Sequence, residues 1–185
     1  VTVGIDPLVN KYKKFYKDIN FKVSDFFTFN NLRKNNLNYK YKVITALSMF
    51  YDLRNPNIFI KDIKKILHKD GVFILEHADL LSLLKYKLFD TICHEHLEYY
   101  SSKIIINLMK KHKLRVFDIK NNRVNGGSSR YFISHEYSKF KNKQKNISKI
   151  LKEEKKIKLE SKDTYLKFFE KINKIKRKTR SLIDN

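Results

Sequence analysis

The sequence predicts an α/β fold, in which a largely parallel sheet carries helices on both faces. Three observations support this prediction. Short apolar runs rich in β-branched residues alternate with segments of helical spacing. Several of these runs end close to a polar residue, as strands do at the edge of a buried sheet. Hydrophobic residues make up 42% of the 185 residues, which is enough for a substantial core.

Four apolar runs in the first half of the chain are expected to be strands, and they cover residues 1–6, 21–27, 42–50 and 72–75. The run at 42–50, KVITALSMF, is the most continuous, so we expect a central strand that is buried on both faces. Two later strands are expected at 114–119 and 130–135. They would pair antiparallel around a turn that contains Gly126 and Gly127.

The helical segments lie between these strands. Spacing or helix-start signals predict helices over residues 8–17, 57–67, 78–89 and 102–112, and residues 30–40 are expected to form a loop or a frayed helix. From residue 146 onward an apolar stripe indicates a long amphipathic helix with a lysine-rich outer face, formed by Phe168, Ile172, Ile175, Thr179 and Leu182. We therefore expect one domain over residues 1–140, followed by a basic helical segment over 141–185.

The net charge of +22 allows two interpretations. It is either an electrostatic footprint for nucleic acid or another polyanion, or a lysine-biased composition with a solvated helix face. We favour the second, since arginine- and glycine-rich RNA motifs are missing, and we expect neither a nucleic-acid partner nor a membrane. The single cysteine, Cys93, excludes an internal disulfide and a cysteine-cluster zinc site, which fits a cytoplasmic location.

Polar side chains near the ends of the predicted strands are expected to line one crevice, because ligands of parallel sheets bind beyond the carboxyl ends of the strands. They are Asp6, Asp25, Ser48 and Glu76. Asp6 can accept hydrogen bonds from a ribose, or it can cap the next helix. Asp25 with Phe26 can contact a purine, or the pair can be a turn acid beside a core aromatic residue.

The densest group of proton-carrying side chains lies in the stretch 89–101, FDTICHEHLEYYS. His94, Glu95 and His96 fit a base site, in which one imidazole removes a proton and the carboxylate orients the substrate. A metal site with His94 and His96 as ligands and a purely structural role for the histidines are the alternatives. Downstream, the NGGS turn at 125–128 can bring backbone close to a phosphate or sugar, or it can be a simple hairpin turn.

The ordered segments VTVGIDP, KVSDFF, VITALSMFYDLRNPN, DGVFILEH, FDTICHEHLEYYS, LRVFDI and VNGGSSRYFISHE resemble the S-adenosylmethionine-dependent class I C-methyltransferases that act on nucleotide-linked 4-keto-sugars. The resemblance runs from about Val1 to about Glu136. It implies a Rossmann-like sheet, S-adenosylmethionine as the cofactor, and a nucleotide-sugar substrate.

The resemblance also implies roles for individual residues. Asp6 and Pro7 would meet the cofactor ribose, Asp25 and Phe26 the adenine, and the segment Ala46, Leu47 and Ser48 the methionine part. His96 would match the family's proposed base, which deprotonates a carbon beside a keto group, with Glu95 in support. On the substrate side of the crevice we expect Glu76, His77, Tyr99, Asn125 and Gly126.

This chain departs from the family pattern in several places. The resemblance implies that the first strand with its glycine-rich loop, a zinc-binding N-terminal module and a second Rossmann-like domain belong to a parent chain and are missing here. The sheet is then incomplete, and we expect the chain alone to be inactive and to bind the cofactor poorly. An RNA methyltransferase and a non-catalytic polyanion-binding protein are the alternative functions.

Overall fold

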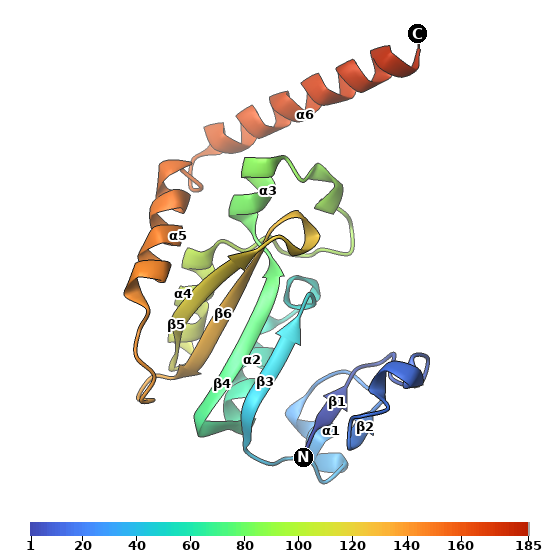
Figure 1. Cartoon of the computed structure of the whole chain (residues 1–185), viewed down its shortest axis with the longest axis vertical. Helices are drawn as coiled ribbons and strands as arrows, with labels where there is room; N and C mark the ends of the chain where they lie inside the picture. Colours follow the sequence, from blue (N-terminus) through green and yellow to red (C-terminus); the bar gives the residue numbers. More distant parts are fainter. Residues whose placement is uncertain (185) are drawn as a thin grey trace.

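In the computed structural model, which describes residues 1–184, the strands form two separate sheets (Figure 1). The first sheet pairs β1 (Val3–Ile5) with β2 (Phe21–Val23) in parallel. The second has the order β3-β4-β6-β5 and is built from β3 (Tyr41–Leu47), β4 (Leu67–Ala78), β5 (Leu114–Asn122) and β6 (Ser128–His135). β3 runs parallel to β4, whereas β6 runs antiparallel to both of its neighbours.

Side-chain caps fix where the first four α-helices begin. Thr28, Asn55, Asp79 and Ser101 each accept a hydrogen bond from the backbone N–H of the third residue of the helix that follows. These helices are α1 (Phe29–Lys34), α2 (Pro56–Ile66), α3 (Leu80–Tyr86) and α4 (Ser102–Lys111). α5 (Gln144–Lys156) and α6 (Lys162–Ile183) follow, and short 3₁₀ helices lie between the main elements: η1 (Lys13–Tyr16), η2 (Phe50–Asp52), η3 (Phe89–Thr91) and η4 (Val124–Gly126).

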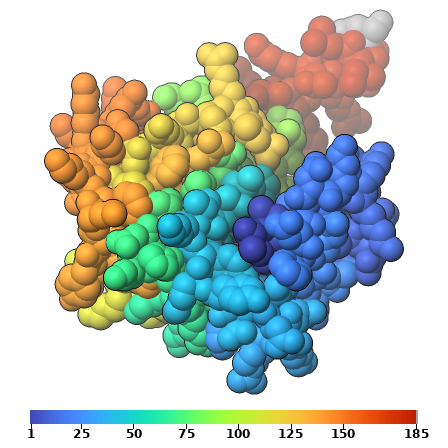
Figure 2. All heavy atoms as spheres, turned by 60° about the horizontal axis from the view of Figure 1, so that its bottom comes forward, coloured from blue at the N-terminus to red at the C-terminus, as the bar shows by residue number. Residues whose placement is uncertain are grey.

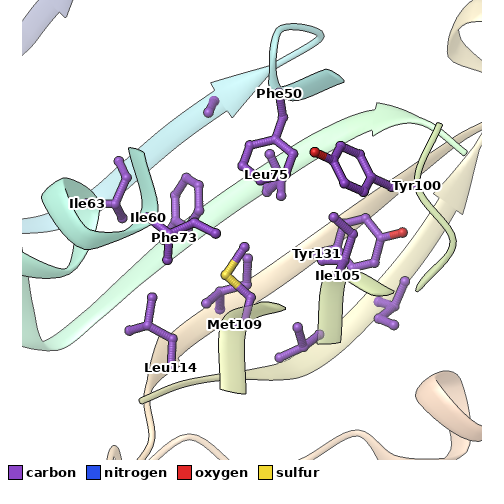
Figure 3. Packing of buried hydrophobic residues seen from close by; sticks show 14 of the residues in the cluster. Phe50, Ile60, Ile63, Phe73, Leu75, Tyr100, Ile105, Met109, Leu114 and Tyr131 are labelled. Atoms are coloured by element: carbon purple, nitrogen blue, oxygen red, sulfur yellow. The ribbon is translucent and has the colours of Figure 1, made fainter. Parts of the chain in front are cut away.

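The main core lies on one face of the four-stranded sheet (Figure 3). Phe73 and Leu75 of β4 align with Ile133 and Tyr131 of β6, and all four are completely buried. Side chains from α2, α4 and α5 pack onto them, among them Ile60, Ile63, Ile105, Met109 and Ile150. Each such side chain contributes about 1.5–3 kcal/mol on burial, so this cluster holds the larger part of the molecule together.

The helices cover the four-stranded sheet on one face, and the expected helices on both faces are therefore wrong for this sheet. Figure 1 shows α2 and α4 behind the strands and no helix in front of them, within the residues 1–184. β3 was expected to be buried on both faces, yet Val43 is 62% exposed and Leu47 is 54% exposed. The reason is that Val43 and Leu47, four residues apart in the strand, point to the same face, which no helix covers in the described part of the chain.

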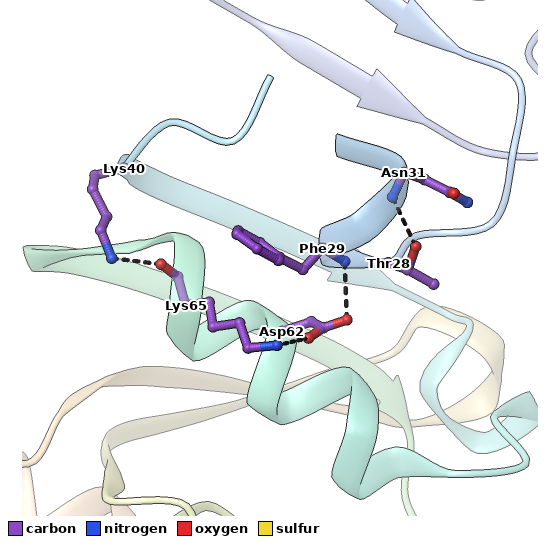
Figure 4. A network of polar contacts seen from close by, with 6 residues as sticks. All are labelled: Thr28, Phe29, Asn31, Lys40, Asp62 and Lys65. Carbon is purple, nitrogen blue, oxygen red and sulfur yellow. Dashed lines mark hydrogen bonds and ion pairs between the residues drawn. The ribbon is translucent and has the colours of Figure 1, made fainter. Parts of the chain in front are cut away.

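The two-stranded sheet has a small core of its own, attached to α2. Its buried residues are Val23, Leu32, Leu37 and Ile66, the last of which belongs to α2. Polar contacts add to the attachment (Figure 4): Asp62 accepts a 2.9 Å hydrogen bond from the backbone N–H of Phe29 and pairs with Lys65. Figure 2 shows this N-terminal unit, in blue, lying beside the cyan strand β3.

Several elements differ from their predicted bounds. Residues 8–17 form turns and η1 instead of an α-helix, because Val9 is the only buried residue in that segment and no apolar face is packed. Part of the segment 30–40 is helical, as α1. β4 begins directly after α2 and extends to Ala78, so Glu76 and His77 lie inside the strand and not beyond its end.

The antiparallel pairing of β5 with β6 is confirmed, and so is the long C-terminal helix. α6 has no buried residue and projects away from the sheet in Figure 1. α5, by contrast, places Ile147 and Ile150 in the main core. No helix between residues 1 and 184 is long and apolar enough to span a bilayer.

Candidate active site

A groove of about 550 Å³ separates the two sheets. It is bounded by β1 on one side and β3 on the other, at edges of these strands that pair with no other strand among residues 1–184. Most of the predicted cofactor residues line it, namely Asp6, Pro7, Phe26, Ala46 and Leu47. Residues far apart in the sequence are thus brought to one concave surface.

Asp6 lies directly after β1, where the chain leaves the sheet. Its backbone N–H donates to the carbonyl of Val23, which extends the pairing with β2. Its Oδ1 accepts a 2.6 Å hydrogen bond from the backbone N–H of Leu8. The carboxylate therefore caps the turn, as one interpretation expected, and lines the groove, as the other expected.

Asp25 and Ser48, the other two predicted cofactor residues, are not part of the groove lining. Asp25 accepts a 2.7 Å hydrogen bond from the N–H of Phe26, whose ring is 73% exposed and lines the groove. Ser48 adopts a positive φ of 53° and donates its N–H to the carbonyl of Glu76. It bends the chain away from the sheet immediately after β3.

The loop 89–101 is attached to η2, just beyond the end of β3. The backbone N–H groups of Leu97 and Glu98 both donate to the carbonyl of Tyr51, at 3.0 and 3.1 Å. The ring of Tyr51 packs against the imidazole of His96, with 4.3 Å between the ring centroids. These contacts hold the histidine-rich stretch beside the end of β3, next to residues that line the groove.

His96 is half-buried and its ring is held by the backbone of its own loop. Its Nδ1 lies 2.8 Å from the carbonyl oxygen of Thr91. A carbonyl only accepts hydrogen bonds, so the neutral imidazole carries its proton on Nδ1 and its lone pair on Nε2. The hydroxyl of Tyr99 donates to the same carbonyl at 3.4 Å. The geometry therefore leaves Nε2 as the basic atom.

His94 and Glu95 are exposed side chains of the same loop, and Cys93 is a partly exposed free thiol. No group of three or more histidine, cysteine, aspartate or glutamate side chains lies close enough to hold a metal ion in the described part of the chain. The fixed tautomer of His96 is compatible with a base site, which stays a prediction.

Sequence reasoning did not identify Tyr51 and Asp52 as site residues. Asp52 lines the groove, and its pKa is raised by burial and by the nearby Glu95, while His96 acts to lower it. Burial is also the main cause that raises the pKa of Tyr51, followed by the charge of Asp52. A polar pair directly after the apolar run 42–50 was the available signal.

Glu76 and His77, both expected on the substrate side, occupy different environments. Glu76 is 5% exposed and forms an ion pair with Arg130, its cross-strand neighbour on β6. His77 is completely buried between the rings of Phe50 and Tyr131, and burial lowers its pKa. Its Nδ1 lies 2.8 Å from the carbonyl of Ala78, while Nε2 has no hydrogen-bond partner among residues 1–184.

Asn125 and Gly126 lie in η4, the turn that joins β5 to β6. Both have positive φ, 52° and 78°, so the expected hairpin turn is present. Gly126 also lines a second cavity of about 590 Å³, which is separate in its lining from the groove. The turn therefore has a structural role and lines this second cavity.

Comparison with known proteins identifies two matching families. Residues 1–118 match the model of a methyltransferase domain, and residues 123–185 match that of a C-methyltransferase C-terminal domain. The C-methyltransferase NovU of Streptomyces niveus is 33% identical over 87 residues, which are 47% of this chain and 21% of that protein. The chain thus spans about a fifth of the length of this curated relative.

Solved structures agree on the fold. A SAM-dependent methyltransferase of Thermotoga maritima, described as a possible histamine N-methyltransferase, aligns with a TM-score of 0.52 at 16% identity, over 74% of this chain and 73% of that one. The magnesium protoporphyrin IX methyltransferase of Synechocystis, solved with bound SAH, aligns at 0.51 and 9% identity, over 73% and 74%. The Rossmann-like methyltransferase fold is confirmed, and by its match over residues 1–118 the chain belongs to the methyltransferase-domain family.

Proposed function

We propose that this chain forms the catalytic part of an S-adenosylmethionine-dependent C-methyltransferase whose acceptor is a nucleotide-linked keto-sugar. The observation that carries the proposal is the junction of the groove with the loop 89–101. Asp52, on the groove wall, follows Tyr51, which packs against His96. A cofactor in the groove and an acceptor at the loop would then meet at one place. The C-methyltransferase match over residues 123–185 and the relative NovU support carbon as the methylated atom.

The lining of the groove fits an adenosine-containing cofactor. Asp6 offers carboxylate oxygens for ribose hydroxyls, and the exposed ring of Phe26 offers an apolar surface for a base. Ala46 and Leu47, at the end of β3, leave room for the amino-acid end next to Asp52. When bound, S-adenosylmethionine supplies a methyl group that is activated by its positively charged sulfur.

His96 is proposed to act as the general base. Its Nε2 takes the proton from the acceptor carbon next to the keto group, and the enolate so formed is the carbon nucleophile for the methyl group. The Thr91 carbonyl fixes the tautomer and also stabilises the imidazolium, because Nδ1–H remains hydrogen-bonded after protonation. Glu95, exposed on the same loop, is proposed to bind or orient the sugar.

The decisive experiment is His96→Gln in the parent protein, because the chain alone is expected to be inactive, in an assay of labelled methyl transfer to a panel of nucleotide-linked keto-sugars. A lost base should lower kcat by ~10²–10⁴-fold, while cofactor affinity stays within a factor of about two. His94→Gln is the matched control and should retain activity, because His94 is exposed and lacks the contact with Thr91. Methyl transfer to RNA but to no sugar would contradict the proposed acceptor.

A second variant, again in the parent protein, tests the groove independently of the loop. Asp6→Asn keeps the size of the side chain but removes its charge, so the affinity for S-adenosylmethionine should fall about tenfold or more, as a charged hydrogen bond is weakened. Asp25→Asn is the control, since Asp25 is outside the lining. Equal losses in both variants, measured by calorimetric titration, would show that the groove is not the cofactor site.

A further inference from the structure

The second cavity, of about 590 Å³, lies where three elements meet: α3, the β5–β6 turn and α5. Its lining includes Leu81 and Ile150 as apolar floor and Asn121 and Asn122 as amides. It shares no lining residue with the groove between the sheets. The cavity is therefore separate from the groove, and we call it the basic pocket after the lysine and arginine side chains in its lining.

Three cationic side chains line the basic pocket, Lys85, Arg123 and Lys149, against a single acid, Glu153. Lys85 forms an ion pair with Glu153 at 3.3 Å, and the two charges offset each other. Neither Arg123 nor Lys149 forms an ion pair with any of the residues 1–184. Two uncompensated positive charges thus face one cavity from two different elements.

The glycines of the turn shape one wall of the pocket. A Cβ on Gly127 would lie 2.6 Å from the Cβ of Ser82 on α3, and a Cβ on Gly126 would lie 2.9 Å from Leu88. Only glycine permits this close approach of the turn to α3 and to the segment that follows it. The backbone of the turn is therefore held close to α3, the helix that carries Lys85.

We propose that the basic pocket binds the diphosphate of a nucleotide-linked ligand. Arginine presents a planar fork of donors that matches phosphate oxygens, and lysine adds a point charge, which is the usual composition of a phosphate site. A pocket this size exceeds the needs of one inorganic phosphate and suits a diphosphate with part of its organic substituent.

The basic pocket is connected to the catalytic loop by a short series of contacts. Gly126 packs against Leu88, the hydroxyl of Thr91 donates to the carbonyl of Leu88, and His96 is hydrogen-bonded to the carbonyl of Thr91. A ligand with its diphosphate in the pocket would extend along this loop toward His96. That this ligand is the methyl acceptor rests on the proposed function, whereas the presence of a diphosphate site does not.

The test is calorimetric titration of the purified chain with inorganic diphosphate, uridine diphosphate and uridine. Arg123→Ala and Lys149→Ala should each weaken the binding of both diphosphates by about tenfold or more, since each removes one charged hydrogen-bond donor. Lys152→Ala is the charge-matched control, because Lys152 is exposed on the same helix but does not line the pocket. Uridine should bind much more weakly than its diphosphate.

Equal losses in Lys149→Ala and Lys152→Ala would overturn the proposal, since the binding would then reflect the overall charge of +22. Tighter binding of a single-stranded oligonucleotide than of either diphosphate, with the same dependence on Arg123 and Lys149, would also overturn it. A titration with S-adenosylmethionine runs in parallel. A working diphosphate site, together with no methyl transfer by the parent protein to any sugar, would contradict the proposed acceptor and leave the proposed pocket ligand unaffected.

Discussion

The two sheets of this molecule differ in how they are held together. The four-stranded sheet buries large side chains such as Phe73, Leu75 and Tyr131 completely under three helices. The two-stranded sheet has three residues per strand and packs on a cluster of four buried residues, one of which belongs to α2. The first region has the means to fold as a cooperative unit, and the second depends on its attachment to the first.

The groove lies between these two regions, and each contributes part of its lining. Asp6 and Phe26 come from the weakly supported unit, whereas Ala46 and Leu47 come from the well-packed sheet. No backbone ladder crosses the groove within residues 1–184. A ligand that contacts both walls would therefore tie the N-terminal unit to the rest, and the two regions should respond differently to mutation.

The largest expected effect is the loss of a core ring from the four-stranded sheet. Phe73→Ala leaves a cavity in a fully buried site and should lower the free energy of unfolding by about 3–5 kcal/mol, enough to unfold much of the chain. Leu32→Ala in the small cluster should instead loosen the N-terminal unit. Urea unfolding followed by circular dichroism measures both, and a larger loss for Leu32→Ala would reverse the comparison.

An intermediate effect is expected at Glu154, which joins α5 to the four-stranded region. Its carboxylate is 5% exposed and accepts hydrogen bonds from the backbone N–H groups of Ser102 and Lys103, where α4 begins. Glu154→Ala leaves these donors without their acceptor and should cost about 1–3 kcal/mol of unfolding free energy. Glu153→Ala, which breaks a partly exposed ion pair, should cost less than about 1 kcal/mol in the same experiment.

The smallest effect is a pH dependence that originates at His77. Burial lowers the pKa of this histidine, so below pH ~6.5 the unfolded chain binds a proton that the folded chain does not. The stability that neutral His77 contributes is present above pH ~6.5 and is lost as the pH falls, by at most ~1.4 kcal/mol per pH unit.

His77→Phe should remove this part of the acid sensitivity, which is visible as a flatter plot of unfolding free energy between pH 7 and pH 5. His94→Gln, at an exposed position, should leave the slope of the wild type unchanged. An unaltered slope in His77→Phe would mean that other groups, such as His112 with its similarly lowered pKa, dominate the acid response.

The order of elements in the chain followed from its sequence, because the apolar periods of α2, α4 and the β5–β6 hairpin reflect faces that are packed in the structure. The helix expected at residues 8–17 is absent for a related reason, because Val9 is the only buried residue in that segment and no apolar face is packed. The exposure of β3 was not predictable from its apolar run, because a strand's composition does not reveal whether helices cover both of its faces.

In the candidate site, too, some residues were predictable from the sequence and others only became apparent in the folded structure. Asp6, Ala46 and His96 were identified because strand ends and a dense group of ionisable residues are visible in the sequence. The contact of Tyr51 with His96 arises between residues 45 positions apart in the chain, and only the folded loop reveals it. The basic pocket likewise gathers Lys85, Arg123 and Lys149 among many lysines that no pattern distinguishes.

The alignment of the strands around β6 limits which mutations this chain can tolerate during evolution. Glu76 faces Arg130 and His77 faces Ser129, so adjacent residues of β4 present a charged group to one face and a core ring to the other. A shift of one residue in this pairing would place the carboxylate in the core and the imidazole outside it. Substitutions in the β5–β6 turn that retain its two glycines leave the pairing of β6 with β5 unchanged, whereas a single insertion or deletion there would shift it. We therefore expect related sequences to keep the length of the segment 121–127 constant and to retain Arg123, Gly126 and Gly127, while its other positions vary in residue type.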